Sequence, residues 1–385
     1  MGEWKEKSLS DLAILYNDSW KVGDEECPYI ALEHIEESKL RLNGIGHSDI
    51  IASNKYRFNE KNFLFGKLRP YFRKVVKPQF SGICSTDIWV VGACSETDLT
   101  FLFYLFANQA FVDLAYSGSS GTRMPRADWK FMKDTVWLIP SDIEEQRAIA
   151  SVLSSLDDKI DLLHRQNKTL EAMAETLFRQ WFVEEAQEDW EENSLLEVIQ
   201  LIGGGTPKMA IDEYWDGDIP WLAGGDIASN HKSFINCSVK SITEVGLNNS
   251  SAKLLPKYAT VISARGTVGK YCLVAQSMAF SQSNYGILPN PKISECFFFT
   301  YLLVNHVVEE LQSSAYGSVF DTITTTTFKE IKVILPTETE NLRFEQSVSP
   351  YFKKMFLNKS QIRTLEKLRD TLLPKLMSGE VRVKT

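Results

Sequence analysis

Hydrophobic positions recur at alternating steps of three and four residues in two long stretches of the chain. The first stretch runs from Ser141 to Phe182, and its apolar positions are Ile149, Leu153, Leu156, Ile160, Leu163, Leu170, Leu177 and Trp181. Asn167 holds a polar position in this seam, and a single seam asparagine is a device that fixes the register of paired helices. The spacing predicts a helix of about 42 residues, roughly 63 Å long.

The second stretch, from Thr337 to Met377, carries a similar seam with Lys359 in its weak position. Its apolar positions are Val348, Phe352, Met355, Ile362, Leu365, Leu368, Leu372 and Leu376. Pro350 and Pro374 are expected to bend or fray this helix. Neither apolar stripe can stay in water, so we expect the two helices to pair in antiparallel sense within one chain. The alternative is that each helix pairs with another subunit.

The chain also repeats itself. A proline followed by a capping hydroxyl and a carboxylate three residues later opens each long helix, at Pro140–Glu144 and again at Pro336–Glu340. Earlier matches join Trp4, Ser8 and Leu9 to Trp190, Ser194 and Leu195, and Tyr104, Leu105 and Asn108 to Tyr301, Leu302 and Asn305. A globular unit followed by a long helix, repeated once, predicts a pseudo-symmetric molecule with two similar working surfaces.

The globular units show short apolar runs and helical segments in the same order. Strand-like runs at 136–140 and 333–336 feed the long helices, and helices are expected at 99–116 and 296–313. The remainder consists of short alternating runs broken by Gly, Asn and Pro. We therefore predict an α+β fold with globular units at residues 1–140 and 188–336, and long helices at 141–187 and 337–385.

Composition changes this picture little. The 385 residues are 44% hydrophobic and 24% charged, and no apolar run approaches the roughly 20 residues that span a bilayer. The beginning of the chain is too polar for a signal peptide. The six cysteines form no Cys-x-x-Cys pair, so we interpret them as reduced core thiols of a cytoplasmic protein rather than as disulfides or metal ligands. The five histidines add no metal-ligand spacing, and no metal site is expected.

Charge is unevenly distributed. The net charge of −8 argues against a nucleic-acid partner at first sight, but many of the acids crowd between Glu184 and Glu192. A basic segment lies elsewhere, and its cations are Lys55, Arg57, Lys61, Lys67, Arg69, Arg73, Lys74 and Lys77, against the single acid Glu60. A phosphate backbone would respond to this local charge rather than to the total.

Several catalytic patterns are absent. Gly266–Lys270 is too short for a phosphate-binding loop, and Gly203–Gly205 lacks the spacing of a dinucleotide fingerprint. The chain has no Pro-Pro pair, which excludes the Asn-Pro-Pro-aromatic motif of amino-methyltransferases. No nucleophile, base and orienting acid stand out as a set. We expect no catalysis and no bound cofactor.

The remaining chemistry is that of binding. In the first unit, cations alternate with aromatic rings, and the candidate DNA contacts are Gly66, Lys67, Arg69, Tyr71, Arg73, Lys74 and Lys77, followed by Ser85, Thr86 and Asp87. The corresponding candidates of the second unit are Lys208, Arg265, Thr267, Lys270, Tyr271, Gln282, Ser283 and Asn284. The alternative is a solvated strand edge in the first unit, with turns that satisfy their own backbone.

With these residues identified, the chain resembles the specificity subunit of a type I restriction–modification system over essentially its whole length. The motifs that carry the resemblance are Leu138–Pro140 with Glu145–Ala150, Val152–Ser154 and Leu156–Ile160, then Gly203–Lys208 with Tyr214–Trp221 and Gly225–Ile227, and Gly66–Tyr71 with Ser85–Asp87. Two departures exist. The first unit has Tyr16–Trp20 where a Gly-Gly-Thr-Pro opening would stand, and the second helix has Asn341–Gln346 in place of a Glu-Gln-x-x-Ile core.

The resemblance implies two target-recognition domains separated by two long antiparallel coiled-coil helices, each domain reading one half of a split DNA sequence. It implies that the helices set the spacing between the halves and dock two modification subunits, which carry S-adenosylmethionine and methylate adenine. ATP-dependent restriction subunits are a further implied partner. The second departure leaves open how alike the two docking surfaces are.

Two other functions remain open. The chain could be a DNA methyltransferase in its own right, and the purified chain tested with cofactor and DNA would distinguish this reading. It could instead be a coiled-coil scaffold without DNA specificity, and binding to a random DNA pool would decide. The missing methyltransferase motif weighs against the first, and the basic segment with the doubled globular units weighs against the second.

Overall fold

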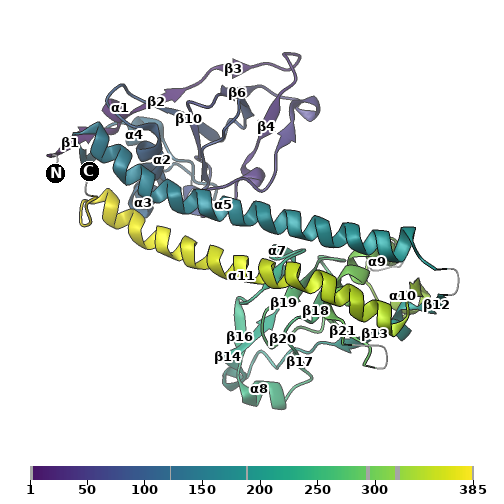
Figure 1. The fold of residues 1–385 in the computed structure, drawn as a ribbon. Helices are drawn as coiled ribbons and strands as arrows, with labels where there is room; N and C mark the ends of the chain where they lie inside the picture. The colour runs from purple at the N-terminus through teal and green to yellow at the C-terminus, as the bar shows by residue number, and fades with distance from the viewer. Residues whose placement is uncertain (1–2, 122, 188–189, 292–294, 317–320, 384–385) are drawn as a thin grey trace. The chain divides into compact units, whose positions relative to one another are not determined.

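The computed structural model describes residues 3–121, 123–187, 190–291, 295–316 and 321–383 (Figure 1). Residues 188–189 of the acidic segment lie outside this range. The chain divides into two compact units. Unit 1 comprises Met1–Leu162 and Ile362–Thr385, and unit 2 comprises Leu163–Gln361. Both long helices therefore contribute residues to both units, and each unit is described by itself below.

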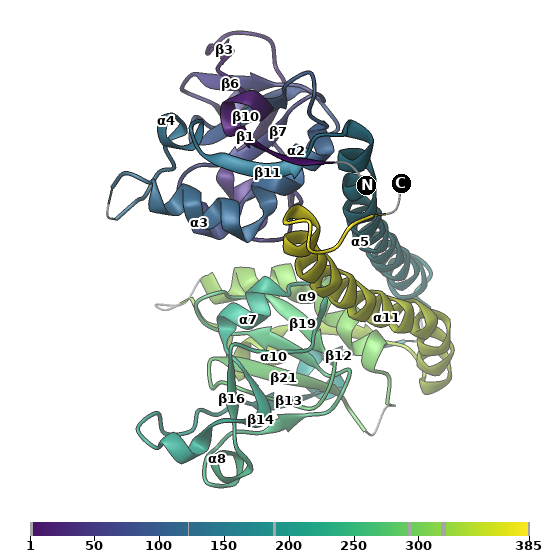
Figure 2. The same ribbon diagram turned by 90° about the vertical axis from the view of Figure 1, so that its left-hand side faces the viewer.

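Unit 1 contains two main sheets. The first has the order β2 (Ala13–Tyr16), β10 (Ile88–Ala93), β7 (Phe63–Gly66), β8 (Val75–Val76), and all its pairs are antiparallel. The second has the order β3 (Ser19–Trp20), β6 (Lys55–Phe58), β9 (Gly82–Cys84), β4 (Pro28–Ile30), β5 (Gly46–His47), with a parallel β4–β9 pair. Figure 2 shows β1 (Trp4–Ser8) beside its antiparallel partner β11 (Val136–Pro140). The helices are α1 (Leu9–Leu12), α2 (Leu99–Ala107), α3 (Gln109–Ser117) and α4 (Trp129–Met132), with 3-10 turns η1 (Leu32–His34), η2 (Ser48–Ile50) and η3 (Pro70–Phe72).

Unit 2 also contains two main sheets. Their orders are β13 (Ile199–Gly203), β21 (Asn284–Pro289), β18 (Thr260–Ser263), β19 (Tyr271–Val274), β15 (Phe234–Ile235), and β16 (Lys240–Ile242), β14 (Trp215–Leu222), β20 (Met278–Phe280), β17 (Leu254–Leu255). Strand β12 (Glu191–Ser194) pairs with β22 (Lys332–Leu335). The helices are α6 (Leu195–Val198), α7 (Gly224–Ser229), α8 (Glu244–Asn248), α9 (Phe297–Tyr316) and α10 (Thr325–Glu330), with the 3-10 turn η5 (Asp212–Tyr214).

The two units share one topology, as the sequence repeat predicts. Strand order β2-β10-β7-β8 in unit 1 corresponds to β13-β21-β18-β19 in unit 2, and β6-β9-β4-β5 corresponds to β17-β20-β14-β16. The corresponding pairs β4–β9 and β14–β20 are both parallel. In both units the first strand leads into a short helix in which a carboxylate accepts a hydrogen bond from the capping serine. Asp11 Oδ2 accepts from Ser8 N at 3.2 Å and Glu197 Oε2 from Ser194 N at 2.9 Å. The fold is thus α+β and pseudo-symmetric.

One difference from the expected elements lies at Asn108. The helix predicted over 99–116 is two helices, α2 and α3, which meet at an angle of 63°. The backbone of Asn108 is extended, and its side chain accepts a hydrogen bond from Ala110 N, so it ends one helix and caps the next. In unit 2 the corresponding segment is the single helix α9. Among the described residues, no single helix is long and apolar enough to cross a bilayer, and only the bent pair α2 and α3 taken together meets that criterion.

The long helices form part of the core of each unit. Helix α5 spans Ile143–Arg179 and continues in a π-helical turn, η4 (Gln180–Glu184), and α11 spans Glu338–Met377. In unit 1, Ile149 and Leu153 of α5 share a core with Leu373 and Leu376 of α11. In unit 2, the rings of Phe178 and Phe182 pack with Phe344 of α11. Pro350 and Pro374 both lie within α11 and do not end it.

Each unit shows the helix segments running in antiparallel sense. In unit 1, Asp157 of α5 bonds Arg369 of α11, and Glu145 near the beginning of α5 lies near Arg382, which follows the end of α11 at Met377. In unit 2, Asn167 bonds Asn358 and the ring of Trp181 lies 5.6 Å from that of Phe344. As the residue number rises along α5, it falls along α11 in both units. The expected seam residues that are buried are Ile149, Leu153, Ile160, Leu163, Val348, Phe352, Met355, Ile362 and Leu376. Those that are half-buried are Leu156, Asn167, Leu170, Leu177, Trp181, Leu365 and Leu372.

Two expectations for the second seam are wrong. Asn358, not Lys359, is its buried polar residue, and Asn358 Nδ2 donates to Asn167 Oδ1 at 2.8 Å. Lys359 instead lies near Asn230 and Ser233 of unit 2. Leu368 is 44% exposed, and the neighbouring Arg369 is fully buried in its place. Heptad periodicity predicted Leu368 for the seam, because it does not show that Asp157 and Asp370 accept hydrogen bonds from a buried Arg369.

The long helices also hold the beginning of the main helix in each unit. In unit 1, Gln146 Oε1 accepts a hydrogen bond from Asp98 N, just before α2, at 2.9 Å. In unit 2, the Glu345 carboxylate accepts from Phe298 N at 3.1 Å and from Phe299 N at 2.9 Å. These amides are among the first N–H groups of a helix, which have no partner within the helix itself.

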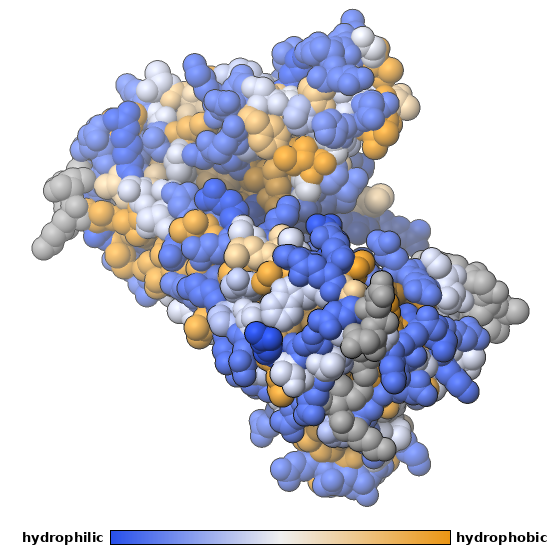
Figure 3. Space-filling view, turned by 45° about the vertical axis from the view of Figure 1, so that its right-hand side comes forward, coloured by the Kyte–Doolittle hydropathy of each residue, from blue (hydrophilic) through white to orange (hydrophobic). Residues whose placement is uncertain are grey.

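No disulfide joins the six cysteines, all of which lie among the described residues, and Cys84, Cys272 and Cys296 are the buried ones. Cys27 and Cys94 are half-buried and Cys237 is exposed, so the expectation of core thiols holds for three of the six. Figure 3 shows hydrophilic residues over most of the face in view, with hydrophobic residues in small groups between them.

Candidate nucleic-acid interface

Three loops of unit 1 are joined by main-chain hydrogen bonds at one edge of its first sheet. Lys67 N donates to Asp87 O at 2.9 Å, Ala127 N to Lys67 O at 2.9 Å, and Arg69 N to Pro125 O at 2.7 Å. We call the surface formed by residues 67–74, 85–87, 119–121 and 123–126 the unit 1 platform. Its shape is set by the backbone and not by mobile side chains, which is the property that a recognition surface needs.

Unit 2 builds the same arrangement. Ser263 N donates to Lys270 O at 2.7 Å, as Gly66 N donates to Lys74 O at 2.8 Å in unit 1. Ala264 N donates to Ser283 O at 2.9 Å, in the way that Lys67 N donates to Asp87 O. An isolated β-bridge joins Arg265 to Thr322, as another joins Leu68 to Arg126. We call residues 264–270, 281–283 and 321–323 the unit 2 platform.

Three cations expected to face DNA are engaged inside unit 1. Arg73 is 8% exposed, and its guanidinium donates to Ser38 O at 2.9 Å and to Asp370 of α11 at 3.2 Å. Lys74 Nζ donates to Leu32 O at 2.8 Å, and Lys77 Nζ donates to Thr100 Oγ1 at 2.8 Å. Burial lowers the pKa of Lys77. These side chains fasten the loop to its own unit, and we remove them from the candidate DNA contacts.

Much of the remaining basic segment is also neutralised within the unit. Lys55 is buried and donates to Ser53 Oγ at 2.6 Å, and Arg57 pairs with Asp24 at 2.7 Å. Gly66 is buried at the end of β7, where a side chain would collide with Leu32. The basic segment therefore does not form an equally basic surface, because most of its cations are buried or bonded to groups of their own unit.

The accessible candidates of unit 1 are fewer. Lys67 and Arg69 are half-buried, Thr86 is exposed, and Tyr71 is 44% exposed with its ring 5.5 Å from that of Tyr116. Ser85 is half-buried and its hydroxyl accepts from Asp87 N at 3.3 Å. Arg69 has a φ of 52°, a left-handed conformation that is uncommon for a residue with a side chain. The loop is thus held in one particular shape with two cations and a ring at its surface.

The third loop of this platform contains none of the residues predicted from the sequence. Residues 119–126, of which Thr122 is not described, contribute the exposed side chains of Arg123 and Arg126. Arg126 pairs with Asp87, one of the candidates, at 2.9 Å. The signal was present in the sequence as two arginines among Gly, Ser and Pro residues, but their proximity to the 67–74 loop depends on contacts across the fold.

The candidates of unit 2 also separate into accessible and structural residues. Lys208, Arg265 and Gln282 are exposed, and Thr267, Lys270 and Ser283 are half-buried. Tyr271 and Asn284 are buried. The Tyr271 hydroxyl donates a hydrogen bond to Asn305 Oδ1, and Asn284 Nδ2 donates one to Ser281 Oγ. The burial of these two side chains removes them from the candidate DNA contacts, because a base or phosphate could not reach them.

The glycines of the 203–208 motif have a structural role. A Cβ at Gly204 would lie 2.2 Å from Ser281 O, and a Cβ at Gly205 would lie 2.2 Å from the carbonyl carbon of Ser251. Only glycine permits this close approach of two backbone segments. The motif therefore positions the 281–283 loop of the unit 2 platform instead of cradling a phosphate.

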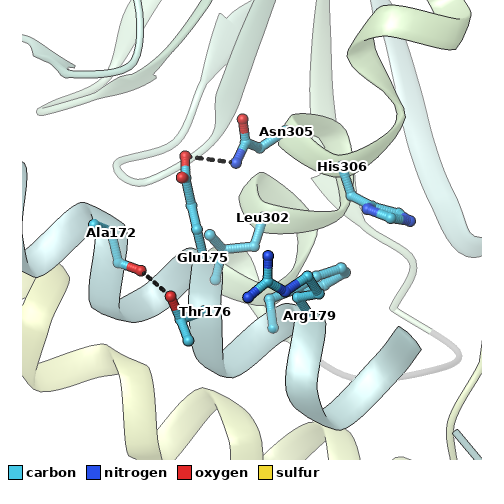
Figure 4. A pocket seen from close by; sticks show the side chains of 8 residues that line it. Ala172, Glu175, Thr176, Arg179, Leu302, Asn305 and His306 are labelled. Atoms are coloured by element: carbon cyan, nitrogen blue, oxygen red, sulfur yellow. Dashed lines mark hydrogen bonds between the residues drawn. The ribbon is translucent and has the colours of Figure 1, made fainter. Parts of the chain in front are cut away.

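A separate cavity of about 300 Å³ lies in unit 2 between α5 and α9 (Figure 4). Glu175 points toward Asn305, whose Nδ2 donates to its carboxylate at 2.7 Å, and Lys232 pairs with the same carboxylate at 3.2 Å. One turn earlier, burial, with a further contribution from Glu175, raises the pKa of Glu171 to about 7. Among the described residues, no group of three or more His, Cys, Asp or Glu side chains could hold a metal ion.

Comparison with known proteins gives a consistent result. A family model described as the type I restriction modification DNA specificity domain matches residues 1–172 and again residues 187–367. The chain is similar to the type I restriction enzyme HindI specificity subunit of Haemophilus influenzae, with 23% identity over 465 residues, 99% of this chain and 100% of the relative. It is also similar to the MjaIX specificity subunit of Methanocaldococcus jannaschii, with 26% identity over 302 residues, 74% of this chain and 69% of the relative.

Among solved structures, the fold is similar to that of the S subunit of a type I restriction-modification system from M. genitalium. The TM-score is 0.59 and the sequence identity 16%, and the alignment covers 97% of this chain and 96% of that one. At this identity the likeness concerns the fold, and it extends over both units.

Proposed function

This chain belongs to the family of type I restriction-modification DNA specificity subunits, and we propose that each of its two units reads one half of a bipartite DNA target. In this family role the chain is a non-catalytic DNA-recognition subunit. The assignment of one half-site to each unit is our inference, and it rests on the repeated platform.

The observation that carries the proposal is one backbone arrangement built twice with different side chains. Three main-chain hydrogen bonds of one platform have counterparts in the other, so the paired parts of their loops correspond, although the 66–74 loop has one residue more than the 263–270 loop. Their side chains differ at matching positions, Lys67 against Ala264 and Asp87 against Ser283. Base sequence is read by side-chain donors, acceptors and apolar groups in the grooves. Two platforms with a similar backbone arrangement and different side chains therefore suit two half-sites of different sequence.

The long helices suit two further tasks, the docking of partner subunits and the spacing of the half-sites. Exposed apolar side chains recur 195 residues apart along them, Leu162 with Leu357 and Met173 with Leu368, and each unit carries one from either helix. Single exposed apolar side chains are common on protein surfaces, so it is the recurrence of these positions in both helices, and not their exposure alone, that favours a similar docking surface on each unit. We propose that these helices dock two modification subunits, one per unit, and set the spacing between the half-sites. S-adenosylmethionine would then be bound by the modification subunits, and ATP-dependent restriction subunits are a further proposed partner.

An exchange of one unit tests the proposal. Residues 190–335 are replaced by the corresponding unit of a relative, and the hybrid chain is combined with its modification subunit. Sequencing of the methylated DNA should show one half-site changed, while the other half-site and the spacing remain as in the wild type. A hybrid that altered both half-sites, or that left both unchanged, would contradict the assignment of one half-site to each unit.

A further inference from the structure

A salt bridge fixes one guanidinium at the surface of the unit 1 platform. Arg126 Nε donates to Asp87 Oδ1 at 2.9 Å, and Arg126 Nη2 lies 3.4 Å from Asp87 Oδ2. The Arg126 side chain is 46% exposed and that of Asp87 is 27% exposed. Because the guanidinium is planar and has five N–H donors, binding along one edge leaves the N–H groups of Nη1 and one of Nη2 directed away from the carboxylate.

The main chain holds both residues in place. Arg126 exchanges hydrogen bonds with Ser120, at 3.0 Å for Arg126 N to Ser120 O and 3.1 Å for Ser120 N to Arg126 O. Lys67 connects the two partner loops, since its N–H donates to Asp87 O and its carbonyl accepts from Ala127 N. The main chain thus fixes where the two residues stand, and the bond to Asp87 gives the free edge of the guanidinium its direction.

The charge of the pair decides what it can bind. Affinity for phosphate comes from net positive charge, and here the Asp87 carboxylate offsets the guanidinium and would repel a phosphate oxygen. The N–H groups on the free edge of Arg126 can still donate hydrogen bonds in a fixed direction. A fork of two N–H groups matches the O6 and N7 acceptors that guanine presents in the major groove.

Building on the proposed function, we propose that Arg126, oriented by Asp87, reads a guanine in the half-site of unit 1. Asp87 is then a positioning residue, because it acts on the base through Arg126. The matching positions of unit 2 are Ser283 and Thr322, which carry no charge. Unit 2 consequently reads its half-site without a guanidinium at this position, which gives the two halves different requirements.

The test uses the full chain with its modification subunit and compares the wild type with Arg126→Ala. Methylated sites are mapped by sequencing, and binding is measured for duplexes changed at one base pair at a time. Arg126→Ala should lose about 5- to 150-fold of its preference for one G·C pair of the unit 1 half-site, the discrimination that a good bidentate pair provides. The preferences of the unit 2 half-site should stay the same, which also shows that the variant is folded. The matched control is Arg123→Ala, an exposed arginine of the same loop, which should leave the motif intact.

A second variant tests the orienting role. Asp87→Asn removes the carboxylate charge, so Arg126 becomes a net cation that is less firmly held. The preference for the G·C pair should weaken, and the slope of log affinity against log salt should become steeper by about one. A residue that only supported the fold would not change that slope in this direction.

Three results would overturn the inference. A motif unchanged by Arg126→Ala would reject it while leaving the proposed function intact. Uniform weakening across all sequences with a flatter salt slope would show a phosphate contact instead of a base contact. A wild-type complex that methylates no bipartite motif would reject the proposed function and this inference together.

Discussion

At the residue scale, Arg369 of unit 1 is the largest fully buried side chain among the described residues, and it is 0% exposed. Its guanidinium donates to Asp157 at 2.7 Å and to Asp370 at 3.1 Å, and the hydroxyl of Tyr104 also donates to Asp157. In the alignment of the two repeats, Ala174 of unit 2 corresponds to Arg369 of unit 1, and Phe352 corresponds to Asp157. The ring of Phe352 packs 5.4 Å from Tyr301, the counterpart of Tyr104. The same fold is therefore built with an ionic cluster in one unit and an apolar contact in the other.

This comparison predicts strong coupling between Asp157 and Arg369. Asp157→Phe alone should destabilise the chain by about 3–5 kcal/mol, because it leaves a buried guanidinium without its main partner. The double variant Asp157→Phe/Arg369→Ala copies the residues of unit 2 and should recover a large part of that loss. Denaturation by urea of the single and double variants measures the coupling energy. Losses that simply add would show that the ion pair and the packing act independently.

A second residue-scale prediction concerns pH. Burial raises the pKa of Glu171 from 4.5 to about 7, so the folded chain holds this proton more tightly than the unfolded chain does. Stability should therefore fall as pH rises from about 4.5 to about 7 and stay constant above that range. Glu171→Gln removes the titration, and its stability relative to the wild type should improve by about 1–3 kcal/mol over this interval. Parallel stability curves for the two chains between pH 4.5 and 8 would refute the assignment.

At the element scale, the helix seam in unit 2 contains a polar pair. Asn358 is fully buried, and its Nδ2 bonds Asn167 Oδ1 while its own Oδ1 has no partner among the described residues. An apolar seam would be more stable, but it could slide by a heptad more easily. The asparagines therefore contribute to the choice of register at a cost in stability.

We expect Asn167→Leu/Asn358→Leu to raise the thermal midpoint and to broaden the range of registers. The gain should be about 1–2 kcal/mol, because an incompletely bonded buried amide is replaced by packed side chains. Spin labels at exposed positions of α5 and α11 would report the register as a distribution of distances. A stabilised pair with an unchanged single distance would show that the apolar residues alone determine the register.

At the scale of the whole molecule, α5 and α11 each pass from one unit into the other. Inserting one heptad into both helices, between Leu163 and Leu170 in α5 and between Met355 and Ile362 in α11, keeps both seams in phase. Each helix becomes longer by roughly 10 Å, which corresponds to about three base pairs. The half-sites should keep their base sequences while the gap between them grows by that amount.

Sequencing of methylated DNA from the insertion variant checks this expectation. The control inserts the heptad into α5 alone, which displaces one seam against the other and should destabilise the chain. If the double insertion changed the base preferences at constant spacing, the helices would have to contact bases themselves, and the proposed separation of roles would be abandoned.

The sequence by itself determined the features that depend on neighbouring residues. Heptad periodicity located both long helices, because residues three and four apart share one face of a helix. The capping residues after Pro140 and Pro336 and the paired tryptophans and tyrosines established the repeat, and the motifs identified the family. The break at Asn108 is also a local effect, but a segment so uniformly apolar does not show where a capping residue will act.

Only the tertiary structure decided which side chains remain free to bind. Arg73, Lys74 and Lys77 look like DNA contacts in the sequence, yet carbonyls, a hydroxyl and a carboxylate from distant segments engage them. Arg126 is distant from the basic segment in the sequence. Its side chain bonds Asp87, 39 residues earlier, and its neighbours Pro125 and Ala127 bond the loop about 60 residues earlier. In the same way, Asn358 and Arg369 are buried at the seam because Asn167 and Asp157 of α5 bond them. Charge pairing and the burial of polar side chains arise from contacts between residues far apart in the chain, and the periodicity of apolar positions does not show which residues make those contacts.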